Sequence, residues 1–349
     1  MNITFLIGNG FDIELGLETR FSDFFKQLSP EKIATNQIYE KIHVSPDEWS
    51  DFELALGKYT FKLGDDYRKL SSEEEKRELI KTFLENLENV KLDLGDYIEK
   101  EELEFKKLGK KFESPKKYMD NLFNDLLPTE NVVFRNVFAG TLDNDYNFSA
   151  ISFNYTSLFD EAMKPLEEAF EWQPFQKIRK GIFGEIVHIH GTFTRFLTLG
   201  VNDLKQIDSE LFEDDEIYQL VKPYDVIETR EDRDGLAIRK ISDSQIIVIY
   251  GMSLGETDKK WWQHICEWLA KNKSNLLIIH AFDADFSSVR ISSKLVKLRQ
   301  NIVKSFLDYY EGEKEYLKEQ IFLLVNNKNF FPQKDLKDAE IPILEKEIN

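Results

Sequence analysis

Five short apolar runs constrain the fold of this chain more than any other feature of its sequence. The first run alternates at its start and ends apolar. The other four do not alternate between apolar and polar residues, as a strand does when one face of its sheet meets water. Unbroken apolar runs are typical of strands covered on both faces, and segments with helical spacing separate several of them. The runs are Asn2–Ile7, Ala150–Phe153, Ile186–Ile189, Gln245–Tyr250 and Asn275–His280.

This pattern predicts an α/β fold of the Rossmann-like kind, with a mainly parallel sheet flanked by helices. Gln320–Val325 is a candidate for one more strand. We expect a single α/β domain over residues 1–349, with a mostly helical insertion at about 57–130 and an irregular excursion at about 202–243. Within the insertion, apolar residues recur at three and four positions, and the charge-dense stretch Glu102–Lys117 is interpreted as a solvated helix surface.

Charge and cysteine content exclude several classes of protein. The 64 acidic and 46 basic residues give a net charge of -18, which repels phosphate backbones and argues against a nucleic-acid partner. The lone Cys266 forms no internal disulfide and no multi-cysteine metal site. The first residues lack a basic leader, and no apolar segment is long enough to cross a membrane. We therefore expect a cytoplasmic protein without a membrane partner.

A glycine turn follows the first apolar run, with the sequence Gly8-Asn9-Gly10-Phe11-Asp12. Glycines at such a turn let the backbone approach a phosphate, and amides at the following helix start bind the anion. The dinucleotide fingerprint of dehydrogenases would need a third glycine where Ile13 stands, which argues against a hydride-transfer enzyme. An ordinary turn between a strand and a helix is the alternative.

The second run ends in the polar cluster Ser152-Phe153-Asn154-Tyr155-Thr156. Open α/β sheets bind ligands beyond the carboxyl ends of their strands, where this cluster is expected to lie. The amide of Asn154 both donates and accepts hydrogen bonds, so it suits a water molecule or a ribose hydroxyl. A cap for the following helix is the alternative.

The third run leads into His188-Ile189-His190-Gly191. Two histidines at strand spacing would share a face and form half of a metal site, but the sequence indicates no further ligand. A neutral imidazole at the strand end can instead act as a general base near pH 7. We assign this role to His190, although the sequence does not decide between His190 and His188, and ordinary hydrogen-bonded histidines are the alternative.

The fourth run precedes Gly251-Met252-Ser253-Leu254-Gly255, with Asp258 close behind. This spacing matches the nucleophile elbow of serine hydrolases, which also requires a later histidine. The later histidines are His264, within a tryptophan-rich predicted helix, and His280, at the end of a predicted strand. We favour a second ligand-binding turn over a hydrolase nucleophile.

Together these motifs resemble those of the AbiH-like family of bacteriophage abortive-infection proteins. The resemblance rests on their order along most of the chain. The matching segments are LIGNGFD with LETRFSDF near the start, WSDFELAL from Trp49 to Leu56, SFNYT, HIHG and YGMSLGETD.

The family in turn is similar to sirtuin-type NAD-binding proteins, and that similarity implies a site. Asn154 and His190 would form the reaction centre. Cofactor contacts would come from the two glycine turns and their neighbours, namely Gly8, Asn9, Gly10, Phe11, Asp12, Thr156, Gly251, Ser253 and Asp258. The four-cysteine zinc module of protein deacetylases has no counterpart here, so NAD-hydrolysing defence proteins are the nearer comparison.

The resemblance implies an anti-phage effector that hydrolyses the N-glycosidic bond of NAD or a related nucleotide. NAD would be the substrate or ligand, and we expect no metal. A sensor that binds a nucleotide or a phage component without catalysis is the main alternative, and a nuclease or other hydrolase is the third. The expected partners are a nucleotide, a phage-encoded trigger and, in a homo-oligomer, other copies of the chain; the sequence does not fix the oligomeric state.

Overall fold

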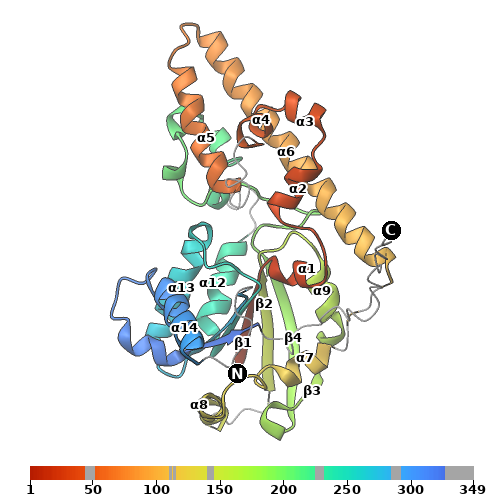
Figure 1. The fold of residues 1–349 in the computed structure, drawn as a ribbon, viewed down its shortest axis with the longest axis vertical. Helices are drawn as coiled ribbons and strands as arrows, with labels where there is room; N and C mark the ends of the chain where they lie inside the picture. Colours follow the sequence, from red (N-terminus) through yellow and green to blue (C-terminus); the bar gives the residue numbers. More distant parts are fainter. Residues whose placement is uncertain are drawn as a thin grey trace, which may run out of the picture.

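The core of the protein is a single seven-stranded sheet with the strand order β3-β4-β2-β1-β5-β6-β7 (Figure 1). The computed structural model describes residues 1–43, 52–109, 112, 115–139, 145–224, 232–283 and 292–326. The strands are β1 (Asn2–Ile7), β2 (Asp145–Ser152), β3 (Phe170–Trp172), β4 (Arg179–His188), β5 (Ile246–Tyr250), β6 (Leu276–Ala281) and β7 (Ile321–Val325).

All five apolar runs lie in this sheet, which confirms the predicted α/β class with a mainly parallel sheet. Every neighbouring pair is parallel except β3 and β4, which pair antiparallel at one edge. β2 and β4 begin well before the apolar runs that predicted them, because their early residues alternate between buried and exposed positions. The three-residue β3 is too short to be found from its sequence.

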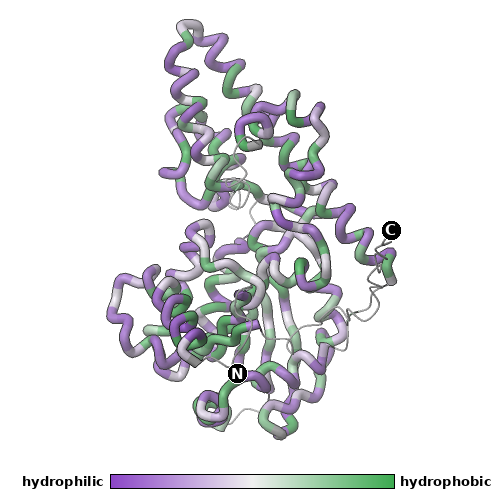
Figure 2. The backbone as a smooth tube through the Cα atoms, in the orientation of Figure 1, coloured by the Kyte–Doolittle hydropathy of each residue, from purple (hydrophilic) through white to green (hydrophobic). Residues whose placement is uncertain are grey.

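Helices cover both faces of the sheet, as unbroken apolar strands require. Phe5 and Val248 face a layer built from α1, α7, α8 and α9. Leu6 and Ile249 face α12, α13 and α14. Figure 2 shows the strands as a largely apolar centre. These helices are α1 (Gly10–Glu14), α7 (Pro115–Asn121), α8 (Pro128–Ala139), α9 (Leu158–Met163), α12 (Arg233–Asp243), α13 (Lys259–Lys271) and α14 (Ser292–Leu307).

A helical lobe stands over the carboxyl edge of the sheet and has its own hydrophobic core (Figure 1). Its longest member, α6, starts at the N-cap Ser72, whose hydroxyl accepts from the Glu75 amide, and ends with Lys106 and Lys107 in its last turn. Acidic residues at its start and basic ones at its end suit the helix dipole. The lobe helices are α2 (Phe21–Gln27), α3 (Pro30–Thr35), α4 (Gln37–His43), α5 (Phe52–Tyr67) and α6 (Glu73–Lys107).

The segment 202–243, expected to be irregular, contains short helical turns and ends in the eleven-residue helix α12. Asp232 caps α12 through the Gly235 amide, and Ala237 and Ile241 bury one face against the sheet. The short elements are η2 (Lys164–Leu166), η3 (Pro174–Gln176), η4 (Leu204–Gln206), η5 (Ser209–Leu211), α10 (Asp214–Ile217), η6 (Glu256–Asp258) and η7 (Glu315–Gln320).

Among the described residues, no helix is both long enough and apolar enough to cross a membrane. Trp49, which contributes to one of the sequence motifs, lies outside the described residues.

Candidate active site at the carboxyl edge of the sheet

The carboxyl ends of β1 and β5 meet in a closed contact between two glycine turns. The Gly8 amide donates to the Tyr250 carbonyl at 2.9 Å, and the Gly10 amide donates to the Gly251 carbonyl at 2.7 Å. A Cβ on Gly10 would lie 2.5 Å from the Gly251 Cα, and Gly251 itself has a φ of 68°. These glycines are therefore needed for close packing of the two turns, and the Gly8 and Gly10 amides are engaged within the chain.

The other residues that the sequence predicted as ligand contacts near these two turns lie in different environments. The Asn9 side chain donates to the Thr19 carbonyl at 3.0 Å, and Phe11 packs edge-on against Phe159. Ser253 is exposed. Asp258 ends η6 and lies close enough to Tyr155 to contribute to its raised pKa.

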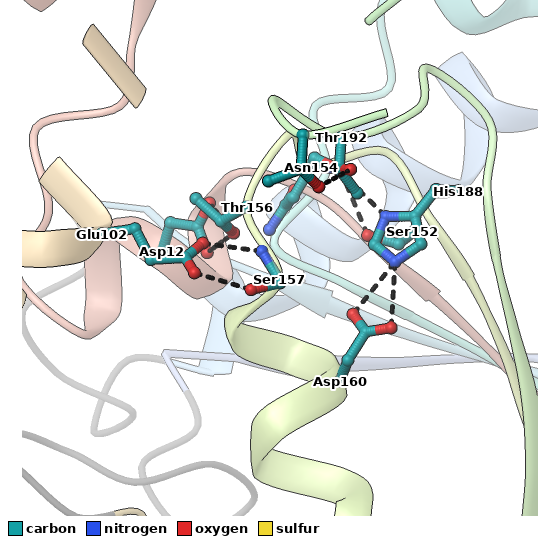
Figure 3. Close-up of polar contacts among 10 residues, drawn as sticks. Asp12, Glu102, Ser152, Asn154, Thr156, Ser157, Asp160, His188 and Thr192 are labelled. Carbon is teal, nitrogen blue, oxygen red and sulfur yellow. Dashed lines mark hydrogen bonds and ion pairs between the residues drawn. The ribbon is translucent and has the colours of Figure 1, made fainter. Parts of the chain in front are cut away.

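A buried polar cluster forms instead between the ends of β1 and β2, where Asp12 of α1 meets the segment after β2 (Figure 3). The Thr156 hydroxyl lies 2.9 Å from both carboxylate oxygens of Asp12 and donates to them. Both side chains are 1% exposed. Burial raises the pKa of Asp12 to about 7, against the opposing influence of Thr156 and Asn154. This carboxyl group therefore exchanges a proton near neutral pH, as a general acid or base must.

Asn154 completes this cluster with an amide that makes no hydrogen bond of normal geometry. Both its Oδ1 and its Nδ2 are sealed from solvent without a partner, and the residue is 3% exposed. The amide lies near enough to Asp12 to lower the pKa of that carboxyl, although no hydrogen bond of normal geometry joins them. Leaving a buried polar group unpaired costs about 1–3 kcal/mol, so an unpaired amide here indicates a place for a ligand.

Glu102 of α6 closes one side of the cluster (Figure 3). Its carboxylate accepts from the Ser157 amide at 2.8 Å, from the Ser157 hydroxyl at 2.6 Å and from the Lys106 ammonium at 2.7 Å. Its negative charge also helps to raise the pKa of Asp12. The long helix α6 thus extends from the lobe core to the site, where it anchors the start of α9.

His188 and Asp160 form the opposite side of the cluster (Figure 3). The His188 Nε2 lies 3.0 Å from an Asp160 carboxylate oxygen, and its Nδ1 lies 3.4 Å from the Asn154 carbonyl. The positive charge of a protonated His188 would lower the pKa of Asp12. The two side chains are 15% and 41% exposed, so this is the accessible side of the site.

His190 follows β4, and its side chain has different partners from those of the Asp12 cluster. Its ring contacts Phe153 and Tyr155, the residues on either side of Asn154, whereas the Asn154 amide faces Asp12. The Lys222 ammonium lies 3.2 Å from its Nε2 and 2.6 Å from the Glu53 carboxylate. Burial and the Lys222 charge hold the pKa of His190 well below its usual range. His190 is therefore a neutral acceptor in a buried ionic contact with the lobe.

The two histidines do not both belong to β4. β4 ends at His188, so the strand alternation that would align the pair does not extend to His190. Among the described residues, no three His, Cys, Asp or Glu side chains gather in a way that could hold a metal ion.

Sequence reasoning located part of this cluster and missed the rest. It selected Asp12, Asn154 and Thr156, and the structure brings these three together. The pattern Ser157-x-x-Asp160 at a helix start could have indicated Asp160. Nothing in the sequence distinguishes Glu102 from its neighbours, because it belongs to a charge-dense stretch whose composition predicts a solvent-facing helix.

Fold and site define an α/β protein with a buried carboxyl–amide cluster at the carboxyl edge of a mainly parallel sheet. The family model described as "Bacteriophage abortive infection AbiH" matches residues 4–280. The chain therefore belongs to the AbiH family of bacteriophage abortive-infection proteins. A comparison with curated protein sequences found no match to it. Similarity to sirtuin-type proteins stays a prediction.

Proposed function

We propose that this abortive-infection protein hydrolyses the N-glycosidic bond of NAD or a related nucleotide at the cluster of Asp12, Asn154 and His188. One observation carries the proposal: a buried carboxyl group with a pKa of about 7 lies beside a buried amide whose oxygen receives no hydrogen bond. The first can move a proton at neutral pH, and the second can hold a polar substrate group. Membership of the AbiH family supports the biological setting.

In this reaction Asn154 and Asp12 have separate roles. Asn154 binds a ribose hydroxyl or orients the attacking water through its unpaired amide. As the bond between C1′ and the base nitrogen breaks, its electron pair leaves with the nicotinamide, which departs neutral. The water oxygen bonds to C1′ and gives its proton to the Asp12 carboxylate, which later releases it to solvent. The products are ADP-ribose, nicotinamide and one proton.

The remaining residues position this centre and admit the substrate. Thr156 fixes the Asp12 carboxylate through its hydroxyl, at 2.9 Å from each oxygen. The substrate enters from the His188–Asp160 side, which is the more exposed one. His188, paired with Asp160, takes the place near the reaction centre that the sequence had assigned to His190. The Gly8 and Gly10 amides take no part in this proposal, because both are bonded to the β5 turn.

Mass spectrometry of purified protein incubated with NAD, NADP, ATP and RNA tests the proposal. We expect free nicotinamide and ADP-ribose from NAD, and a loss of about 10²–10⁴-fold in rate for Asn154→Ala. NAD that binds and stays intact would favour a non-catalytic sensor instead. Cleaved RNA with intact NAD would favour a nuclease.

Asn36→Ala is a matched control for Asn154→Ala. Asn36 is also a buried asparagine, but its amide donates to the Asn86 carbonyl at 2.8 Å and accepts from the Ile38 amide at 3.0 Å. Asn36→Ala should lower the melting temperature and keep the rate per folded molecule. Asn154→Ala should keep the melting temperature and lower the rate per folded molecule. Equal melting losses in both variants would mean that Asn154 is structural.

A further inference from the structure

A polar cavity lies away from the carboxyl-edge cluster, beside α8 and the end of β3, two elements that Figure 1 labels. It has a volume of about 440 Å³, within the range of about 300–1,000 Å³ usual for small-molecule sites. It is bounded by α7, α8 and the connection between β3 and β4. The residues used below are Asn121, Asn124, Asn131, Arg135, Gln173 and Phe175.

Arg135 lies over the ring of Phe175 in this cavity. The Arg135 guanidinium lies 5.2 Å from the centre of the Phe175 ring, and that ring stacks on Phe123 at 5.1 Å with an angle of 12° between the planes. Within the described part of the chain, Arg135 has no carboxylate partner. An unpaired guanidinium in a chain with a net charge of -18 is available to an anionic ligand.

The backbone of Phe175 adopts a strained, left-handed conformation at this position. Phe175 has a φ of 52°, a conformation that bulky residues rarely adopt. Packing of its ring against Phe123 and, edge-on, against Phe138 at 5.5 Å keeps it in place. Backbone strain of this kind tends to gather at ligand sites.

Asp120 also lines the cavity, but its carboxylate pairs with the Lys116 ammonium at 2.7 Å and accepts from the Gln173 backbone amide at 3.0 Å. Most of the other polar side chains supply neutral hydrogen-bonding groups. Four of them are amides: Asn121, Asn124, Asn131 and Gln173. The Asn131 Nδ2 donates to the Leu126 carbonyl at 3.1 Å, but its Oδ1 is sealed from solvent and accepts nothing. No donor among the residues that the structure describes reaches this oxygen.

We propose that this cavity binds a nucleoside monophosphate, at a site separate from the carboxyl-edge cluster. The base stacks on the Arg135 guanidinium, as bases do on arginine planes in proteins that bind single-stranded nucleic acids. The base edge bonds amide side chains that line the cavity. The guanidinium edge bonds the phosphate, for which arginine geometry is well suited.

Isothermal titration calorimetry with AMP, adenosine and inorganic phosphate tests this site. AMP should bind with saturation, and adenosine and phosphate at least about tenfold more weakly, because each lacks one of the two interactions. Arg135→Ala should weaken AMP binding by at least about tenfold. Arg135→Lys, which keeps the charge without the planar group, should also weaken it. Circular dichroism melts would establish that both variants fold.

Two further variants show which site is being measured. Arg195→Ala removes a guanidinium that lies 5.1 Å over Phe196, outside this cavity, and should leave AMP affinity unchanged. Asn154→Ala alters the carboxyl-edge cluster and should also leave it unchanged. The absence of saturable AMP binding, or binding that survives Arg135→Ala, would overturn the proposal. So would AMP binding that disappears in Asn154→Ala. None of these outcomes depends on whether the protein hydrolyses NAD.

Discussion

Two buried polar clusters lie at the same edge of the sheet, and they differ in how fully their groups are paired. In the contact of Glu53, Lys222 and His190, the lysine ammonium is shared by the carboxylate and the neutral imidazole. In the cluster of Asp12, Thr156 and Asn154, the carboxyl has a pKa near 7 and the amide has no partner. A paired cluster of this kind stabilises the fold, whereas an unpaired one is poised for a ligand.

The largest expected effect concerns the unpaired cluster. Asp12→Asn keeps the shape of the side chain and removes its ability to take a proton, so NAD turnover should fall by about 10²–10⁴-fold. Release of nicotinamide, followed by chromatography, measures the rate. Asp208→Asn is the control, because Asp208 is also a buried carboxylate but pairs with Arg68 at 2.6 Å within the lobe. A wild-type rate in Asp12→Asn would remove the acid–base role from this residue.

Substitutions in the paired cluster should lower the free energy of unfolding. Lys222→Met leaves the Glu53 carboxylate buried without its ammonium, which should lower the free energy of unfolding by about 3–5 kcal/mol. Urea denaturation measures this loss. The double variant Glu53→Gln/Lys222→Met should recover part of it, since no lone charge is then buried. If the single variant is as stable as the wild type, the contact does not hold the lobe to the sheet.

Stability should also depend on pH through Asp12. Its pKa is about 7 in the folded chain and 3.8 as the ordinary value, so the folded state holds the proton more tightly. The free energy of unfolding should therefore fall as the pH rises from 4 to 7, by up to about 4 kcal/mol, and level off above 7. In Asp12→Asn, this fall in the free energy of unfolding should be absent. Denaturation curves at pH 5 and pH 8 measure the free energy of unfolding of the wild type and of Asp12→Asn. The same change in this free energy between the two pH values in both proteins would contradict a raised pKa of Asp12.

The smallest expected effect concerns Thr156. Thr156→Val removes the hydroxyl that donates to both Asp12 oxygens and should cost about 1–2 kcal/mol of stability. That hydroxyl lowers the pKa of Asp12, so its loss should move the rising limb of the pH–rate profile to higher pH. An unchanged profile would show that Thr156 supports the fold without tuning the carboxyl.

Local sequence patterns were sufficient to find the sheet. Strands such as β1 and β5 are buried on both faces, so most of their positions are apolar, and this composition can be recognised from the sequence alone. The short edge strand β3 was not found, because its three residues gain their pairing only from β4. The helix α12 was not expected either, in a segment whose mixed charges gave no clear apolar period.

The candidate site was found in part for the same reason. Asn154 and Asp12 follow strands β2 and β1, so their place at the carboxyl edge follows from the strand pattern. That His188 would lie within hydrogen-bonding distance of the Asn154 carbonyl could not be predicted from HIHG. The partners of the two histidines depend on where β4 ends and on Lys222, which comes from a segment 32 residues further along the chain.

The sequence by itself determined the fold class, the polar strand ends and the absence of an internal disulfide, because each depends on residue type and near neighbours. Only the tertiary structure decided which polar groups are paired. Glu102 reads as a solvent-facing residue in the sequence, yet it is buried against Ser157 and beside Asp12. The pKa of a carboxyl and the pairing of an amide are set by burial and by partners distant in sequence, and these exist only once the chain has folded.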